Sequence, residues 1–373
     1  MNLNWTKSIK IIKKFFIFFF IYIFFIIIGD ITYSNLTKDE KIQYDCFHYK
    51  NVNFNNKAYH DYYLKKNCTA TEKQRTVLPY KVYTDKDGYR YSGKKRNENK
   101  QNVVFLGDSQ TYGYGSKFED TFVGMTDKNI SDFEIYNLGM PGYGIKKYYY
   151  TLNEFLENKS VKKVFVILDM TDVTDASLRW VDIPDNISPV VMSNDTNQEM
   201  SRWKKIKNSN FKGTRLLIFY VRNFMRYIKL KVFSTNLGTK DGALKTNLAN
   251  FTYTDIENHQ NLDKEKFDYS LKTIEEYFFK ISELSKVNNF ELYLIIFPWP
   301  ETLIYGQKKF NWENFNSELC KKNNCKKLIN LFGEFKRIKD KDKNWKHLIY
   351  IDDDVHLKKL GNSIIGNKII EQF

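Results

Sequence analysis

The chain has 373 residues, which is long enough for two domains or for one α/β domain that carries insertions. Its formal net charge is +15, but the basic residues are spread along the chain, without a zinc finger, an RNA-binding signature or a dense basic tail. This distribution argues against nucleic acid as a partner, and it suits contact with an anionic lipid or an acidic glycan better.

Residues 1–30 have the pattern of a membrane-directed segment. Four lysines between positions 7 and 14 precede an uninterrupted apolar run at 15–28. As a helix this run spans about 21 Å of a bilayer interior of about 30 Å, and the preceding isoleucines with snorkelling lysines extend it. A cleaved signal peptide is the alternative, but 26–30 offers no small-x-small cleavage site, so we expect an uncleaved membrane anchor. The basic flank stays cytoplasmic, which places the rest of the chain in the periplasm or at the cell surface.

The cysteines agree with export. There are four, Cys46, Cys68, Cys320 and Cys325, and an even count suits a disulfide-forming domain. Cys320 and Cys325 are spaced to close a small loop, with four free thiols as the alternative. None of the spacings is a zinc motif, and we expect neither a metal nor a cofactor.

The pattern of the remaining chain predicts one main domain. Residues 31–100 are polar and rich in tyrosine, and we expect them to form an extracytoplasmic lead-in that packs on that domain. Over 101–373, short apolar strands alternate with helices, which predicts a three-layer α/β/α fold with a mostly parallel, five-stranded sheet. The expected strands are 103–106, 133–137, 163–168, 291–297 and 327–331, and the expected helices are 118–129, 146–157, 268–286 and 359–373.

An insertion at about 176–262 interrupts the alternation. It contains a basic amphipathic helix, predicted at 214–233. Such a helix most often packs its apolar side on the domain as a cap, although it can also lie on an anionic membrane surface.

Ser109 is the first candidate for chemistry. It lies in the run GDSQT (107–111), directly after the apolar strand 103–106, so its hydroxyl is expected at the carboxyl edge of the sheet. A serine nucleophile needs a base, and His356 near the C-terminus follows a run of aspartates. Asp353, three residues before His356, is our first choice for the carboxylate that orients the imidazole, and Asp354 is the alternative. The aspartates at 352–354 do not show the six oxygen ligands of a calcium site, so we expect no metal there.

Acyl transfer also needs hydrogen-bond donors for an oxyanion. The backbone N–H of Ser109 is one candidate. Gly139, in the glycine-rich loop after the second strand, is another, because a glycine lets the backbone approach the substrate.

Together these motifs resemble those of the SGNH (GDSL-type) hydrolases, over a stretch from about residue 88 to the C-terminus. The first block is similar to 107–115, the second to NLGMPGYG (137–144), and the last to DDVH (353–356) with the following 360–362. The sequence FPWP (297–300) is similar to a strand-end motif of membrane-anchored bacterial members. The resemblance implies a flavodoxin-like fold, a nucleophile at Ser109 and an oxyanion donor at Gly139.

One position departs from that family. Its third block carries an asparagine before an aspartate, and the asparagine amide completes the oxyanion hole; here Thr171 stands at that place, before Asp172. Losing one such donor costs about 3 kcal/mol in the transition state. Either the Thr171 hydroxyl substitutes, another group such as Asn137 takes over, or catalysis is impaired.

Two functional hypotheses follow. The first is an extracytoplasmic serine esterase or O-acetyltransferase that acts on an acyl ester; anchored members of the family suggest an O-acetyl ester of a cell-envelope polysaccharide. The second is a catalytically weak glycan-binding or assembly protein on the same scaffold, and Thr171 motivates it.

Overall fold

The computed structural model describes residues 46–54, 57–72, 77–176, 191–192, 264–307, 310–352 and 354–373, with eight separate positions between Ile17 and Thr32. Apart from those eight positions, the described residues belong to one compact unit formed by Gln43–Met192 and Thr239–Phe373. Most of the expected anchor and nearly all of the expected insertion, with its helix at 214–233, lie outside the described residues. Among the described residues we find no helix with the length and apolar character needed to cross a membrane.

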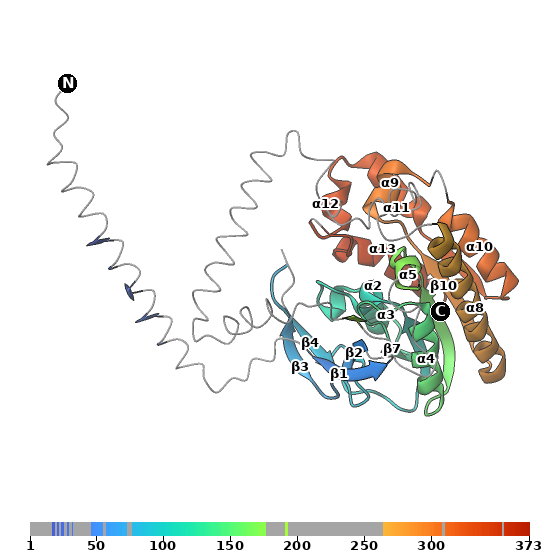
Figure 1. The fold of residues 1–373 in the computed structure, drawn as a ribbon, viewed down its shortest axis with the longest axis horizontal. Coiled ribbons are helices and arrows are strands. Elements are labelled where there is room, and N and C mark those ends of the chain that lie inside the picture. Colours follow the sequence, from blue (N-terminus) through green and yellow to red (C-terminus); the bar gives the residue numbers. More distant parts are fainter. Residues whose placement is uncertain are drawn as a thin grey trace, which may run out of the picture. The chain divides into compact units, whose positions relative to one another are not determined.

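A mixed sheet lies at the centre of this unit (Figure 1). It has eight strands, in the order β11-β10-β8-β6-β7-β5-β4-β3. Its first five members are mutually parallel. They are β11 (Lys327–Asn330), β10 (Glu291–Ile296), β8 (Val161–Ile167), β6 (Gln101–Leu106) and β7 (Phe133–Asn137). These are the five strands expected from the sequence, and in chain order they are arranged 2-1-3-4-5, as in flavodoxin-like folds.

The expected number of strands is wrong, because the N-terminal lead-in extends the sheet. β5 (Arg90–Tyr91) pairs antiparallel with β7, and β4 (Tyr80–Thr84) and β3 (Thr69–Glu72) follow it. The burial of alternate residues of β4 shows that one face of this extension is covered. The strands contain two to five residues, too few for the sequence to show a clear period of two. We call β3, β4 and β5 the N-terminal strands.

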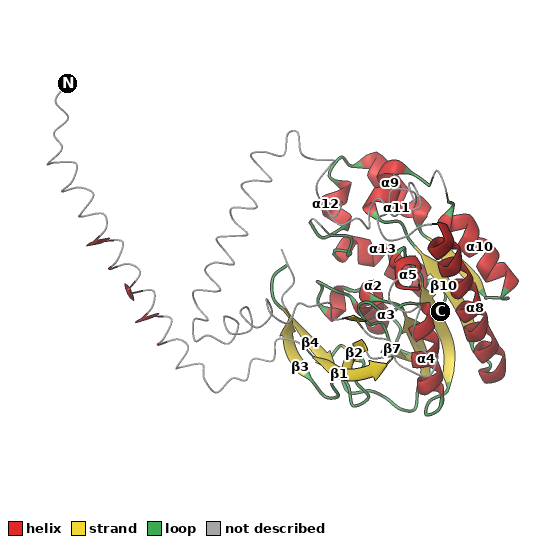
Figure 2. Ribbon diagram, in the orientation of Figure 1, coloured by secondary structure: helices red, strands yellow, loops and turns green. Residues whose placement is uncertain are grey.

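Helices cover both faces of the parallel strands, as Figure 2 shows. Along β6, Val104 and Leu106 point into one core, and Val103 and Phe105 into the other, because successive side chains of a strand alternate in direction. The first core is covered by α4 (Ile145–Leu156), α8 (Lys264–Asn288) and α10 (Trp312–Lys322); the second by α3 (Phe122–Asn129), α11 (Phe332–Lys341), α12 (Trp345–Ile349) and α13 (Lys359–Ile370). The expected three-layer α/β/α architecture is therefore confirmed.

A second, three-stranded sheet consists of β1 (Phe47–Phe54), β2 (Lys57–Leu64) and β9 (Val191–Met192). A disulfide between Cys46 and Cys68 ties the start of β1 to the residue before β3. A second disulfide joins Cys320 and Cys325, so the structure bridges both cysteine pairs.

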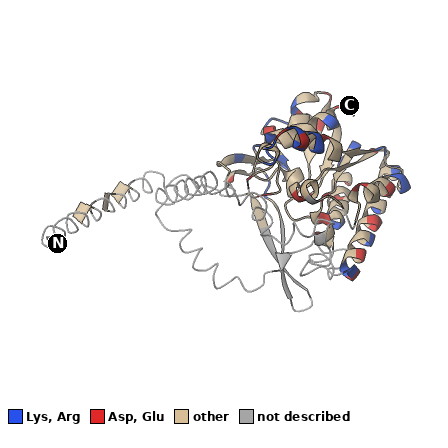
Figure 3. Cartoon of the chain, turned by 90° about the horizontal axis from the view of Figure 1, so that it is seen from above, with Lys and Arg blue, Asp and Glu red and all other residues tan. Residues whose placement is uncertain are grey.

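Charged residues of both signs are interspersed along the helices (Figure 3). On α8, for example, Lys264 pairs with Asp268 at 2.7 Å and Lys280 with Glu276 at 2.8 Å. On α8, basic residues are thus paired with acidic ones one turn away, which is typical of a solvated surface.

Candidate active site

The turn after β6 presents Ser109. The short helix α2 (Ser109–Tyr112) begins with this residue, and Asp108 caps it by accepting the Gln110 N–H at 2.8 Å. Gly107 has to be a glycine, because a Cβ at that position would lie 2.0 Å from Oγ1 of Thr111. Since β6 lies between β7 and β8, Ser109 stands where the strand order reverses, the point at which open α/β sheets bind their ligands.

His356 reaches Ser109 from the far end of the chain. Its Nε2 lies 2.8 Å from the Ser109 Oγ, although 247 positions separate the two residues. A bridge between Tyr350 and Leu357 closes the loop that carries His356, and Gln110 of α2 donates to the Val355 carbonyl at 3.2 Å. The two motifs that the sequence singled out therefore meet at one edge of the sheet.

Asp354 is the carboxylate at His356. Its Oδ1 lies 2.6 Å from Nδ1 of the ring and also accepts the backbone N–H groups of Val355 and His356. Asp353, our first choice, lies outside the described residues. The carboxylate beside Nδ1 is that of Asp354, our alternative. The reason is local: the side chain folds back on the two following amides in an Asx-type turn, which brings Oδ1 to a ring only two residues away.

This geometry sets the tautomer of the imidazole. A carboxylate at Nδ1 accepts the proton there, so Nε2 keeps a lone pair that can accept the Ser109 hydroxyl proton. The Ser109, His356 and Asp354 side chains thus have the order of contacts that activates a serine nucleophile.

Two of the expected oxyanion donors have partners within the fold. Gly139 donates its N–H to Oδ1 of Asn137 at 2.9 Å, and Nδ2 of Asn137 donates to the Thr111 carbonyl at 2.9 Å. A Cβ on Gly139 would lie 2.5 Å from the Tyr112 nitrogen, so this glycine is required for close packing against α2. In contrast, the N–H of Ser109 is the first in its helix and has no intrahelical acceptor.

Thr171 does not present a spare donor either. It begins α5 (Thr171–Thr174), and its Oγ1 lies 2.9 Å from Oδ2 of Asp108 and 2.5 Å from Oδ1 of Asp169. A hydroxyl has one proton, so the proton of Thr171 is committed to a carboxylate. Of the three outcomes that the sequence left open at this position, a Thr171 hydroxyl that replaces the amide donor is not the arrangement in this structure.

Sequence reasoning missed the buried acidic cluster beside Ser109. Asp108, Asp169 and Asp172 are each at most 3% exposed. Burial raises the pKa of the Asp169 carboxyl well above its usual value, and the charge of Asp108 adds to this effect. Burial likewise raises the pKa of Asp172, with the charge of Asp169 as the next cause. The only signal in the sequence was the spacing of aspartates directly after a buried strand.

Asp352 and Asp354 each contact a histidine side chain. Asp352 pairs with Nδ1 of His347 at 2.7 Å and with Lys358 at 3.2 Å, whereas Asp354 contacts Nδ1 of His356. Across the ranges that the structure describes, no three His, Cys, Asp or Glu side chains gather as metal ligands.

No family model and no curated protein matches the chain. Among solved structures, it is similar to a member of the lipolytic protein G-D-S-L family from Veillonella parvula, with 11% identity over 73% of this chain and 98% of that one, at a TM-score of 0.40. It is also similar to an acetylxylan esterase from Geobacillus stearothermophilus (11% identity, 74% and 96% covered, TM-score 0.39). A third similar structure is a psychrotrophic esterase from Pseudoalteromonas (12% identity, 73% and 95% covered, TM-score 0.37).

Proposed function

We propose that the chain is a serine ester hydrolase or acyltransferase of the SGNH type. The observation that carries this proposal is the continuous contact from the Ser109 hydroxyl through the His356 imidazole to the Asp354 carboxylate, at 2.8 and 2.6 Å.

In the proposed reaction, the Ser109 Oγ attacks the acyl carbonyl while Nε2 of His356 takes its proton. The tetrahedral oxyanion then collapses, the alcohol leaves with the proton from His356, and the acyl group remains on Ser109. Water, or a second hydroxyl in the case of transfer, attacks this acyl ester with His356 again as the base, and Ser109 is regenerated. Asp354 holds the imidazole in its reactive tautomer and stabilises the imidazolium ion.

The oxyanion requires backbone donors. We assign the first to the N–H of Ser109. The N–H of Gly139 is engaged by Asn137, so we assign no second donor. Without a further donor at Thr171, we expect the reaction to be slower by two to three decades, on the scale of about 3 kcal/mol per donor.

The proposed substrate is an O-acetyl ester of a cell-envelope glycan, processed outside the cytoplasm. Two observations support the location. The basic and apolar pattern of 1–30 is typical of an uncleaved anchor, and both cysteine pairs are bridged, which is usual in oxidising compartments.

The second candidate is a glycan-binding or assembly protein with little turnover. The commitment of the Gly139 N–H and the Thr171 hydroxyl to partners inside the fold favours it. Folded protein that binds acetylated glycans but hydrolyses none of them would support this candidate.

The test compares hydrolysis of p-nitrophenyl acetate by the wild-type chain, Ser109→Ala and His356→Gln. Either substitution should reduce the rate to that of the uncatalysed reaction or close to it, while the melting temperature stays near that of the wild type. Equal rates in all three proteins would reject the proposed mechanism.

A further inference from the structure

Arg90 of β5 holds the segment that follows the nucleophile helix. Its side chain is fully buried, and one terminal nitrogen donates to the carbonyl oxygens of Tyr112 and Gly113, at 2.6 and 2.9 Å. The other terminal nitrogen donates to the Ser116 carbonyl at 2.6 Å. A helix of four residues leaves its last carbonyls without helical partners, and the planar guanidinium supplies them.

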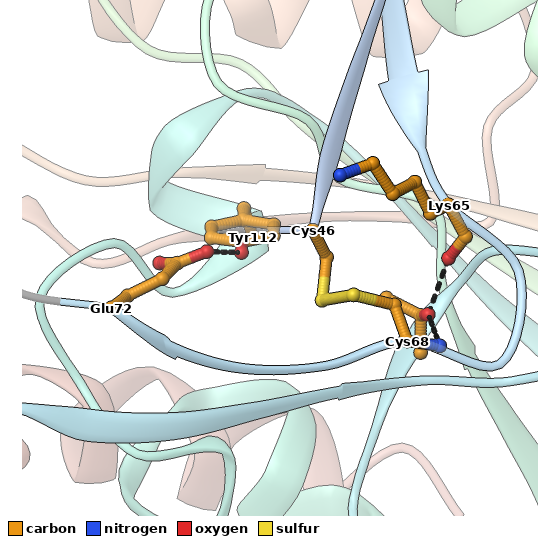
Figure 4. The surroundings of a disulfide bond; sticks show 6 residues. Cys46, Lys65, Cys68, Glu72 and Tyr112 are labelled. Atoms are coloured by element: carbon orange, nitrogen blue, oxygen red, sulfur yellow. Dashed lines mark hydrogen bonds between the residues drawn. A yellow bond between two sulfur atoms is a disulfide. The ribbon is translucent and has the colours of Figure 1, made fainter. Parts of the chain in front are cut away.

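Glu72 and Tyr80 hold the same segment from β3 and β4. Oε1 of Glu72 accepts the Tyr112 hydroxyl at 2.5 Å (Figure 4), and Oε2 accepts the Tyr80 hydroxyl at 2.8 Å. The Tyr80 oxygen in turn accepts the Gly115 N–H at 3.0 Å. Glu72 is 2% exposed, so these bonds form in a water-poor interior, where losing one partner is costly.

The opposite side of this segment contacts the loop of His356. The Tyr114 ring lies against the His356 ring, with centroids 4.7 Å apart, and the Ser116 hydroxyl donates to the Leu357 carbonyl at 3.3 Å. Residues 112–116 therefore continue from the helix of Ser109, contact the loop of His356, and are themselves held by side chains from all three N-terminal strands.

We propose that Arg90, Glu72 and Tyr80 are positioning residues of the Ser109–His356 pair, so that the N-terminal strands form part of the catalytic site. This inference rests on the proposed function. The three residues fix the backbone of 112–116, and this backbone fixes the distance between the hydroxyl and the imidazole. A displacement of about 1 Å at reacting atoms costs up to about a hundredfold in rate, although none of the three residues needs to touch the substrate.

The Cys46–Cys68 disulfide anchors these strands close to Glu72. Cys68 lies directly before β3, its N–H donates to Oγ1 of Thr84 at 2.9 Å, and that hydroxyl donates to the Lys65 carbonyl at 2.5 Å (Figure 4). Phe47, next to Cys46, packs against the Tyr112 ring with centroids 5.8 Å apart. The covalent link thus secures the strand from which Glu72 reaches Tyr112.

The test uses Tyr80→Phe and Arg90→Lys in the full-length chain. Tyr80→Phe keeps the ring but removes the hydroxyl between Glu72 and Gly115, and Arg90→Lys loses the planar fork. Tyr293→Phe is the matched control. It also removes a tyrosine hydroxyl that donates to a glutamate, Glu291, at 2.7 Å, but this pair lies on β10. We expect kcat to fall about ten- to hundredfold in the two test variants with KM unchanged, and to stay within about twofold in the control.

A second readout does not depend on turnover. The imidazole NMR resonances of His356, assigned by their loss in His356→Gln, should shift in Tyr80→Phe and Arg90→Lys but not in Tyr293→Phe. Unshifted resonances, or a kcat that falls only in proportion to the unfolded fraction, would overturn the inference. If the wild type proves inactive, the proposed function fails, and the His356 resonances alone decide whether these residues position the pair.

Discussion

Oδ1 of Asp354 lies 2.6 Å from Nδ1 of His356, although a single residue separates the two in the sequence. The same oxygen accepts the backbone N–H of Val355 at 2.7 Å, so the turn that orients the carboxylate includes the one residue between acid and base. The base and its orienting acid therefore form one local unit, and only Ser109 has to be brought in by the fold.

Asp354→Asn should lower kcat by about three to four orders of magnitude, because an amide at Nδ1 favours the wrong imidazole tautomer. Asp353→Asn should leave kcat within about twofold. The measurement is kcat for p-nitrophenyl acetate, with circular dichroism as the check on folding. If kcat falls more in Asp353→Asn than in Asp354→Asn, then Asp353, the residue that the sequence favoured, orients His356.

Replacement of Thr171 separates two roles of this position. Thr171→Asn should raise kcat, since the amide carries two protons, one for a neighbouring carboxylate and one for the oxyanion. Thr171→Val should lower the free energy of unfolding by about 1–3 kcal/mol, because it removes the bridge between two buried carboxyls. If Thr171→Val instead costs the two to three decades in kcat typical of a lost oxyanion donor, the hydroxyl does serve the reaction.

Asp169→Asn should stabilise the protein at neutral pH. Burial raises the pKa of Asp169 in the folded state, so the folded chain holds a proton that the unfolded chain releases above about pH 4. Stability from this group is complete below that pH and is lost as the pH rises toward the raised pKa. In the wild type, Oδ1 of Asp169 accepts the backbone N–H of Thr171 at 2.7 Å. The asparagine keeps an oxygen for this bond and removes the charge.

Thermal unfolding at pH 4 and pH 8 tests this linkage. The melting temperature of Asp169→Asn should exceed that of the wild type at pH 8, and the difference should vanish near pH 4. A difference that is the same at both pH values would show that Asp169 titrates alike in the folded and unfolded chains.

Opening the Cys46–Cys68 disulfide should cost more stability than opening Cys320–Cys325. The first disulfide joins cysteines 22 positions apart and the second joins cysteines 5 positions apart. If a disulfide stabilises by restricting the unfolded chain, these loops correspond to about 3 and 2 kcal/mol of the free energy of unfolding. Cys46→Ala/Cys68→Ala and Cys320→Ala/Cys325→Ala form a matched pair for urea unfolding. We also expect only the first to lower kcat, because it alone anchors the strand of Glu72. Equal kcat in both double variants would contradict this link.

The sequence predicted the parallel sheet because β6, β8 and β10 each contain a continuous apolar run, as expected where both faces are buried. It did not predict β5, which has only Arg90 and Tyr91 and no period to detect. Ser109 and His356 were identifiable because few residue types can fill their roles. The choice between Asp353 and Asp354 depended on a turn, and the donor capacity of Gly139 and Thr171 depended on which neighbour takes each proton. The turn at Asp354 is local but leaves no distinct signal in the sequence, whereas the contact of Thr171 with Asp108 forms only when two distant segments meet.

The most direct measurement of the central claim is peptide mapping after reaction of the full-length chain with a fluorophosphonate probe. We expect one phosphonylated peptide carrying the label on Ser109, and no labelling in Ser109→Ala or His356→Gln. Undiminished labelling of Ser109→Ala, or a label on another residue of the wild type, would contradict the assignment of the nucleophile.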